Sequence, residues 1–244
     1  GFLTVPVDGS GKDLPLILNP HGGPFGIQDV WRFNAETQFF ANQGYAVMQV
    51  NFRGSGGYGK RYERIGYKRW GLEMQDDLTD AVQWAVSEGI ADPDHVCIYG
   101  ASYGGYATMA GITLTPELYS CAVNYVGIWD LEMLYRQDGR WDSRLGRWFR
   151  DHVIDVEKDE AQIKKTSPRY HIDKIQAPLF IVHGRRDYNV RVEQAETLME
   201  ALDEKGIPYE SLIKREEGHG FTLYENNVEL YTRMQAFFKE HLAK

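Results

Sequence analysis

Short apolar runs alternate along this chain with longer segments in which apolar residues recur every three or four positions. The short runs predict buried strands, and the longer segments predict helices with one apolar face. The predicted strands are 14–19, 45–51, 96–99, 121–126, 179–183 and 210–214. Helical spacing is clearest within 78–85, 192–202 and 228–242. This alternation is typical of an α/β protein with a mostly parallel sheet.

The organisation predicted over residues 1–244 is a single α/β domain, without internal repeats or a low-complexity linker. Residues 129 to 170 interrupt the alternation with a mixture of aromatic and charged residues, and we interpret them as an insertion over the sheet. The first predicted strand begins at Leu14, so little sequence precedes it to form an N-terminal sheet edge.

Composition and charge narrow the class of partner. The chain is 43% hydrophobic and 25% charged, which is typical of a folded globular protein. Its net charge of −8 disfavours binding to nucleic acid or to anionic lipid. No apolar run approaches a membrane span, and the N-terminus lacks the features of a signal peptide. We therefore expect a soluble protein and leave its compartment open between cytoplasm and periplasm or secretion.

The two cysteines, Cys97 and Cys121, each lie alone inside an apolar run. Neither belongs to a CxxC or a Cys/His cluster, so the pattern suggests neither a zinc site nor a disulfide scaffold. We expect two buried free thiols, and the sequence indicates no metal.

The strongest chemical signal is a G-x-S-x-G motif, Gly100 to Gly104, directly after a predicted strand and before a helical run. This is the context of a nucleophile elbow, in which a strained turn projects the serine hydroxyl. The same motif without catalysis would be an ordinary glycine-rich turn with a surface serine. Its context favours Ser102 as the nucleophile.

A serine hydroxyl needs a base, and His219 lies in a short loop after the last predicted strand. Asp187 follows the strand that ends near His183, so the order along the chain is serine, acid, histidine. An Asp or a His alone on a loop is usually a solvated side chain or a turn former. Three such residues at three strand ends favour a catalytic triad.

The developing oxyanion needs at least two donors. The amide of Gly23, in the glycine-rich turn after the first predicted strand, and the amide of Tyr103 are the candidates. We expect His21 to be structural, because His219 already occupies the base position in the motif order. The glycine-rich segment 51–59 lacks a nucleotide-binding pattern, so we do not expect phosphate binding there.

Five motifs in order resemble the catalytic domain of the prolyl oligopeptidase family of serine peptidases, over nearly the whole chain. They are HGGP at 21–24, NFRGSGGYG at 51–59, GASYGGY at 100–106, HGRRDYNV at 183–190 and GHGF at 218–221. The resemblance implies an α/β-hydrolase fold and a triad of Ser102, Asp187 and His219. HGGP is more similar to the acylaminoacyl-peptidase-like branch than to members that place a tyrosine hydroxyl in the oxyanion hole.

Members of this family normally carry a β-propeller ahead of the hydrolase domain, and nothing in this chain encodes one. The chain is expected to be either a catalytic fragment or a hydrolase with a more open site. Its partners would be short peptides, together with a missing N-terminal propeller or a second copy of the chain.

The resemblance also implies a substrate pocket lined by Tyr103, Val126 and Trp129, which suits an apolar or aromatic side chain before the scissile bond. Ordinary core positions are the alternative interpretation for Val126 and Trp129. Arginines recur at near-helical spacing in the insertion, with aspartates between them, so a solvated or domain-contacting face is expected, with recognition of a substrate carboxylate as the alternative. The arginines are 136, 140, 144, 147 and 150, and the aspartates are 138, 142 and 151.

The function predicted is hydrolysis of short peptides through an acyl-enzyme on Ser102, by an acylaminoacyl- or dipeptidyl-peptidase-like enzyme that needs no cofactor. A carboxylesterase could use the same machinery on small esters, because a triad does not define the leaving group. A binding module that retains the fold without catalysis is the third hypothesis.

Overall fold

A seven-stranded sheet organises the part of the chain that the computed structural model describes, residues 1–7, 11–137 and 143–242. The strand order is β1-β3-β2-β4-β5-β6-β7, and every neighbouring pair is parallel except β1 with β3. The strands are β1 (Phe2–Thr4), β2 (Leu14–Leu18), β3 (Ala46–Gln49), β4 (Ala91–Ala101), β5 (Cys121–Tyr125), β6 (Leu179–Gly184) and β7 (Tyr209–Lys214). Six parallel strands therefore end at one edge of the sheet.

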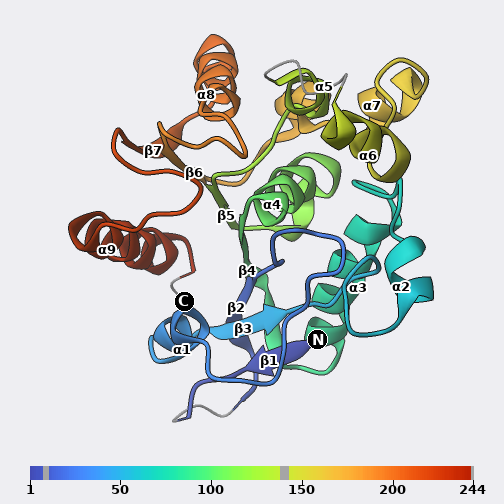
Figure 1. Cartoon of the computed structure of the whole chain (residues 1–244). Helices are drawn as coiled ribbons and strands as arrows, with labels where there is room; N and C mark the ends of the chain where they lie inside the picture. Colours follow the sequence, from blue (N-terminus) through green and yellow to red (C-terminus); the bar gives the residue numbers. More distant parts are fainter. Residues whose placement is uncertain (8–10, 138–142, 243–244) are drawn as a thin grey trace.

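Helices cover both faces of this sheet (Figure 1). One face is covered by α1 (Ala35–Ala41) and α9 (Tyr224–His241), and the other by α3 (Glu73–Ser87), α4 (Tyr103–Leu114) and α8 (Glu193–Lys205). The amphipathic spacing explains the packing, since Leu78, Val82 and Ala85 of α3 are all fully buried. Within the described residues, no helix has the length and apolar character to cross a membrane.

The predicted strands agree with β2 to β7, although β4 begins earlier and is longer than expected. The expectation that too little sequence precedes Leu14 to form a sheet edge is wrong. Residues 2 to 4 form β1, which pairs antiparallel with β3 and places Phe2 opposite Gln49. Three residues are too short for the alternation of apolar and polar positions to be recognised.

The segment between β5 and β6 is helical and contains most of the predicted insertion. It comprises α5 (Leu131–Arg136), α6 (Arg144–His152), α7 (Glu160–Thr166) and η3 (Pro168–Lys174). Two shorter elements lie elsewhere, α2 (Lys60–Arg64) and η1 (Pro116–Leu118). The segment is attached to α4, because the Tyr106 hydroxyl donates a hydrogen bond to the Thr166 carbonyl at 2.8 Å.

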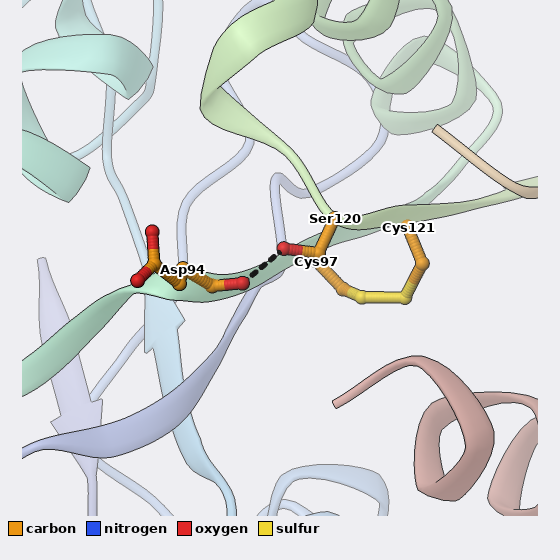
Figure 2. Close-up of a disulfide and its surroundings, with 4 residues drawn as sticks. All are labelled: Asp94, Cys97, Ser120 and Cys121. Atoms are coloured by element: carbon orange, nitrogen blue, oxygen red, sulfur yellow. Dashed lines mark hydrogen bonds between the residues drawn. A yellow bond between two sulfur atoms is a disulfide. The ribbon is translucent and has the colours of Figure 1, made fainter. Parts of the chain in front are cut away.

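Cys97 on β4 and Cys121 on β5 occupy paired positions on neighbouring strands, with Cα atoms 4.6 Å apart. Their sulfur atoms form a disulfide, close to a hydrogen bond from the Ser120 hydroxyl to the Asp94 carbonyl (Figure 2). The prediction of free thiols is therefore wrong, although both side chains are fully buried as expected. The two residues are 24 positions apart, and only the register of β4 against β5 brings them together.

Candidate active site

Ser102 lies in the turn between β4 and α4 with φ 59° and ψ −118°, a conformation that non-glycine residues rarely adopt. Two backbone hydrogen bonds of 3.0 Å hold it, from its amide to the Tyr125 carbonyl and from the Tyr106 amide to its carbonyl. The flanking glycines are needed because a Cβ at Gly100 would collide with the backbone of Gly104. The turn therefore presents Ser102 at the carboxyl edge of the sheet, where ligand sites of open α/β sheets lie.

Asp187 and His219 are in direct contact, with 2.7 Å between Oδ2 of the aspartate and Nδ1 of the histidine. Asp187 is 1% exposed, and its Oδ1 accepts hydrogen bonds from the amides of Asn189 at 2.8 Å and Val190 at 2.9 Å. Burial disfavours ionisation of this carboxyl. Hydrogen bonds from two histidines and from the Val190 amide outweigh that penalty and hold the pKa of Asp187 well below its ordinary value. Asp187 is therefore a buried, ionised hydrogen-bond acceptor for His219.

The loop that carries His219 is organised by a second buried carboxylate, Glu217. Its two oxygens accept hydrogen bonds from the Thr222 amide at 2.8 Å and the Leu223 amide at 3.0 Å. Burial opposes ionisation of this group as well, but these contacts and one from Asn226 lower the pKa of Glu217 below its ordinary value. Glu217 thus fixes the loop that leads from His219 into α9.

The glycine-rich turn after β2 lies close to the nucleophile. Gly23 and Tyr103 line the same pocket as Ser102, and a Cβ placed at Gly22 would lie 3.5 Å from the Ser102 Cβ. Tyr103 is the first residue of α4, so its amide lacks an intrahelical acceptor. The two residues selected from the sequence as oxyanion donors therefore line the same cavity as Ser102.

His21, in the same turn, packs against residues of the loop that follows β3. Its ring stacks on Phe52 with centroids 4.4 Å apart, and its Nε2 lies 2.9 Å from the Ser55 hydroxyl. Burial lowers the pKa of His21 despite a hydrogen bond to the Gly22 carbonyl. These contacts agree with a structural role for His21.

A pocket of about 160 Å³ opens beside Ser102. Its walls come from the Trp70 region, from the segment after β5, from α5 and α6, and from the acid loop after β6. The apolar lining side chains are Trp70, Tyr103, Ile128, Leu134, Tyr135, Leu145, Trp148, Phe149, Val153 and Val190. Asn189 and Val190, whose amides bind Asp187, also line it, so the acid loop and the nucleophile border one cavity.

Of the three residues expected in this pocket, the structure places only Tyr103 in its lining. Val126 and Trp129 are 2% and 4% exposed and belong to the two packed cores. The Trp129 indole donates to the Thr197 hydroxyl at 3.0 Å, which directs it toward α8. Both residues therefore occupy the core positions that the sequence left open as the alternative.

Sequence reasoning missed the contribution of α6, which supplies Leu145, Trp148 and Phe149 to the pocket. The signal was present as helical spacing of these residues, but it was hidden among arginines. Among the described arginines of this segment, none lines the pocket, and Arg136 and Arg150 bind Glu132 and the Tyr135 hydroxyl. Arg140, Asp138 and Asp142 lie outside the described residues.

The chain is similar in sequence to a known protein family and to its members. The family model described as "Prolyl oligopeptidase family" matches residues 31–244. Dipeptidyl aminopeptidase BIII of Pseudoxanthomonas mexicana is 37% identical over 252 residues, covering 99% of this chain and 36% of that protein.

Two solved structures show the same fold over 99% of this chain. A puromycin-hydrolyzing peptidase of Mycobacterium tuberculosis gives a TM-score of 0.90 at 30% identity, and the match covers 37% of that chain. Acylaminoacyl peptidase of Pyrococcus horikoshii gives a TM-score of 0.88 at 27% identity, and the match covers 39% of that chain. The chain thus spans somewhat more than a third of the length of these proteins and shares their α/β-hydrolase fold.

Proposed function

Because the chain belongs to the prolyl oligopeptidase family, we propose that it is the catalytic unit of a serine peptidase that hydrolyses short peptides through an acyl-enzyme on Ser102. The observation that carries the proposal is the 2.7 Å contact between Asp187 and His219, at the sheet edge where Ser102 occupies its strained turn. The relatives support the class of substrate, since they are named as dipeptidyl and acylaminoacyl peptidases.

In the proposed mechanism, Asp187 holds His219 in the tautomer with a proton on Nδ1, so that Nε2 carries the lone pair. His219 Nε2 removes the Ser102 proton as the serine oxygen attacks the substrate carbonyl. The amides of Gly23 and Tyr103 donate to the oxyanion. His219 then transfers the proton to the leaving amine, and a water molecule hydrolyses the acyl-enzyme by the same steps.

The pocket supports an apolar side chain on the acyl side of the scissile bond. Its described lining consists of apolar and aromatic side chains, glycines, Ser102 and Asn189, and includes no charged residue. A lining of this kind gains binding free energy by removing apolar surface from water. We therefore propose Phe, Tyr, Leu or Met as preferred residues at that position.

The relatives are longer than this chain, so we also propose which partners accompany the catalytic unit. We keep the expectation of a β-propeller domain or a second copy beside the catalytic unit. It is supported by large exposed side chains such as Trp31 and Phe33, which lie after the glycine-rich turn.

Labelling with a fluorophosphonate, followed by peptide mapping, tests the enzyme class. We expect one adduct, on Ser102, that is absent from Ser102→Ala and unchanged in Ser87→Ala, a control at an exposed position of α3. Matched aminoacyl amides and esters then separate the two hydrolase activities. Absence of an adduct would leave the binding-module hypothesis, and turnover of esters alone would favour the carboxylesterase.

A further inference from the structure

His183 is a second histidine in contact with Asp187. It lies on β6, is 1% exposed, and places its Nε2 3.4 Å from Asp187 Oδ2, the same oxygen that His219 contacts. We infer that His183 is a positioning residue for the proposed triad: it holds the acid loop so that Asp187 Oδ2 faces His219. This inference rests on the proposed function, since it assigns a role within the same site.

The hydrogen bonds define the tautomer of His183. Its Nε2 lies 2.8 Å from the Val190 carbonyl, which only accepts hydrogen bonds. Nε2 must therefore carry a proton, and that proton points toward Val190 with Asp187 Oδ2 nearby. His183 thus donates from Nε2 on the acid loop, whereas His219 must offer a lone pair to Ser102.

The loop from Gly184 to Val190 is closed by contacts at both of its ends. The Val190 carbonyl accepts from His183, the Val190 amide donates to Asp187 Oδ1, and the Asp187 amide donates to the Gly184 carbonyl at 3.2 Å. Removing the His183 donor leaves a buried carbonyl without its partner and frees the loop at one side. The orientation of Asp187 then depends on the loop amides and on the contact with His219 alone.

A role in packing alone makes a different prediction. Val182, the neighbour of His183 on β6, is also fully buried but offers no polar side-chain contact. If His183 only filled space, Phe at position 183 would be nearly neutral for catalysis, and Val182→Ala would affect the protein by a similar loss of packing. A positioning role makes the two variants differ in catalysis.

The experiment compares His183→Phe, His183→Gln and Val182→Ala in the full chain. Glutamine is included because its side-chain amide nitrogen can replace the Nε2 donor. For each variant, kcat and KM are measured with an activated ester of an aromatic amino acid. The proton on His219 Nδ1 is followed as a far-downfield signal in the proton NMR spectrum, and the tautomer of His183 is read from nitrogen-15 shifts of the unsubstituted chain.

We expect His183→Phe to lower kcat by about 10²-fold, because misplacement of a catalytic group by about 1 Å has effects of this size. KM should stay within about twofold, and the downfield signal should broaden or disappear. His183→Gln should recover much of both readouts, and Val182→Ala should keep them. Unchanged kcat and an unchanged signal in His183→Phe would overturn the inference, as would an Nε2 without a proton on His183 in the unsubstituted chain.

Failure of the proposed function is a separate outcome. An unsubstituted chain that shows the downfield signal but hydrolyses no substrate would contradict the peptidase proposal, and the NMR comparison would still decide the role of His183. An unsubstituted chain without the signal would overturn the inference together with the triad. If His183→Phe does not fold, two measurements still test the positioning role. The unsubstituted chain must carry a proton on His183 Nε2, and His183→Gln must keep a near-normal kcat.

Discussion

The backbone of Ser102 holds a strained conformation that costs about 1 to 3 kcal/mol at such positions. Other contacts of the fold offset this cost. Ser102 is held by backbone hydrogen bonds to the Tyr125 carbonyl and from the Tyr106 amide, and neither involves its hydroxyl. The side chain of Ser102 can therefore be replaced without altering the turn, so a substitution tests the hydroxyl group and not the backbone conformation.

Ser102→Ala is expected to lower turnover by about 10⁴-fold or more, because the members of a triad act as a unit. The free energy of unfolding should change little, since the alanine keeps the Cβ and the backbone contacts. Steady-state kinetics with an activated ester and urea unfolding of the same sample check both points. Substantial residual turnover in a folded Ser102→Ala variant would show that another group is the nucleophile.

Asp187 should also make stability depend on pH. Its pKa is lowered in the folded chain, so the unfolded chain takes up the proton first as the pH falls. The stabilisation is therefore complete above the unfolded carboxyl pKa of about 3.9 and is lost progressively as the pH falls below it. Asp187→Asn should reduce the free energy of unfolding at neutral pH. It should also make the decrease of that free energy below about pH 4 less steep.

Urea unfolding at a series of pH values tests this assignment, with Glu200→Gln as a control at an exposed carboxyl of α8. The control should keep the slope of the unsubstituted chain. The same Asp187→Asn variant should lose activity by about 10³ to 10⁴-fold through disorientation of His219. An unchanged acid slope with intact activity would exclude Asp187 as the buried acid.

At the scale of elements, α6 is the part of the insertion that defines the pocket. Its Trp148 lines the cavity and also contacts Phe25, two residues after Gly23, with ring centroids 6.0 Å apart. The end of the helix is joined to the loop before α3, since the Lys68 amide donates to the His152 carbonyl at 2.6 Å. One helix therefore connects the side-chain pocket with the turn proposed to bind the oxyanion.

Trp148→Ala is expected to reduce the preference for aromatic over small side chains before the scissile bond by about 1 to 3 kcal/mol of transition-state binding. The ratio of kcat/KM for a Phe and an Ala substrate measures it. Trp84→Ala, which removes an exposed indole on α3, is the matched control. Trp129→Ala should leave the ratio unchanged while lowering stability, because Trp129 packs in the core. The opposite pattern would place the pocket at Trp129.

The disulfide connects two elements that already pair in the sheet. Its closed loop of 24 residues corresponds to about 3 kcal/mol of stabilisation by loop-entropy arguments. Cys97→Ala combined with Cys121→Ala should therefore unfold at lower urea concentration. In protein purified without reductant, a thiol reagent should find no free thiol even after denaturation. Two reactive thiols in the denatured, unreduced protein would restore the original expectation of free cysteines.

For the molecule as a whole, the sequence predicted what depends on local order. The helical and strand periods located β2 to β7, and the motif around Ser102 predicted both the strand before it and the helix after it. Parallel strands end at one edge, so the positions of Asp187 and His219 after β6 and β7 already implied that they lie at the same edge of the sheet as Ser102.

The sequence could not predict features that depend on register or on packing between distant segments. The disulfide required the pairing of Cys97 with Cys121, and β1 required an antiparallel partner for three residues. The pocket wall required the placement of α6 against the Ser102 turn, which no local pattern encodes. Val126 and Trp129 were expected at the site because the family resemblance implied it, and an apolar residue after a strand is compatible with either a pocket lining or the core.

The surface after the glycine-rich turn carries the last prediction. Trp31 and Phe33 are 85% and 78% exposed, and the Trp31 ring lies 6.0 Å from that of Phe2 on the edge strand β1. Contiguous exposed apolar patches, unlike single exposed apolar residues, mark interaction surfaces. The net charge of −8 opposes association of two copies, and salt screens that repulsion.

We therefore expect the chain to self-associate as concentration or salt rises, with a mass by light scattering that exceeds the monomer mass of 28.0 kDa. Trp31→Ser combined with Phe33→Ser should restore the monomer mass, because it removes the apolar surface that association would bury. Trp84→Ser, at an exposed position on α3, should have no such effect. A monomer mass at every concentration and salt level would show that this surface does not bind a second copy.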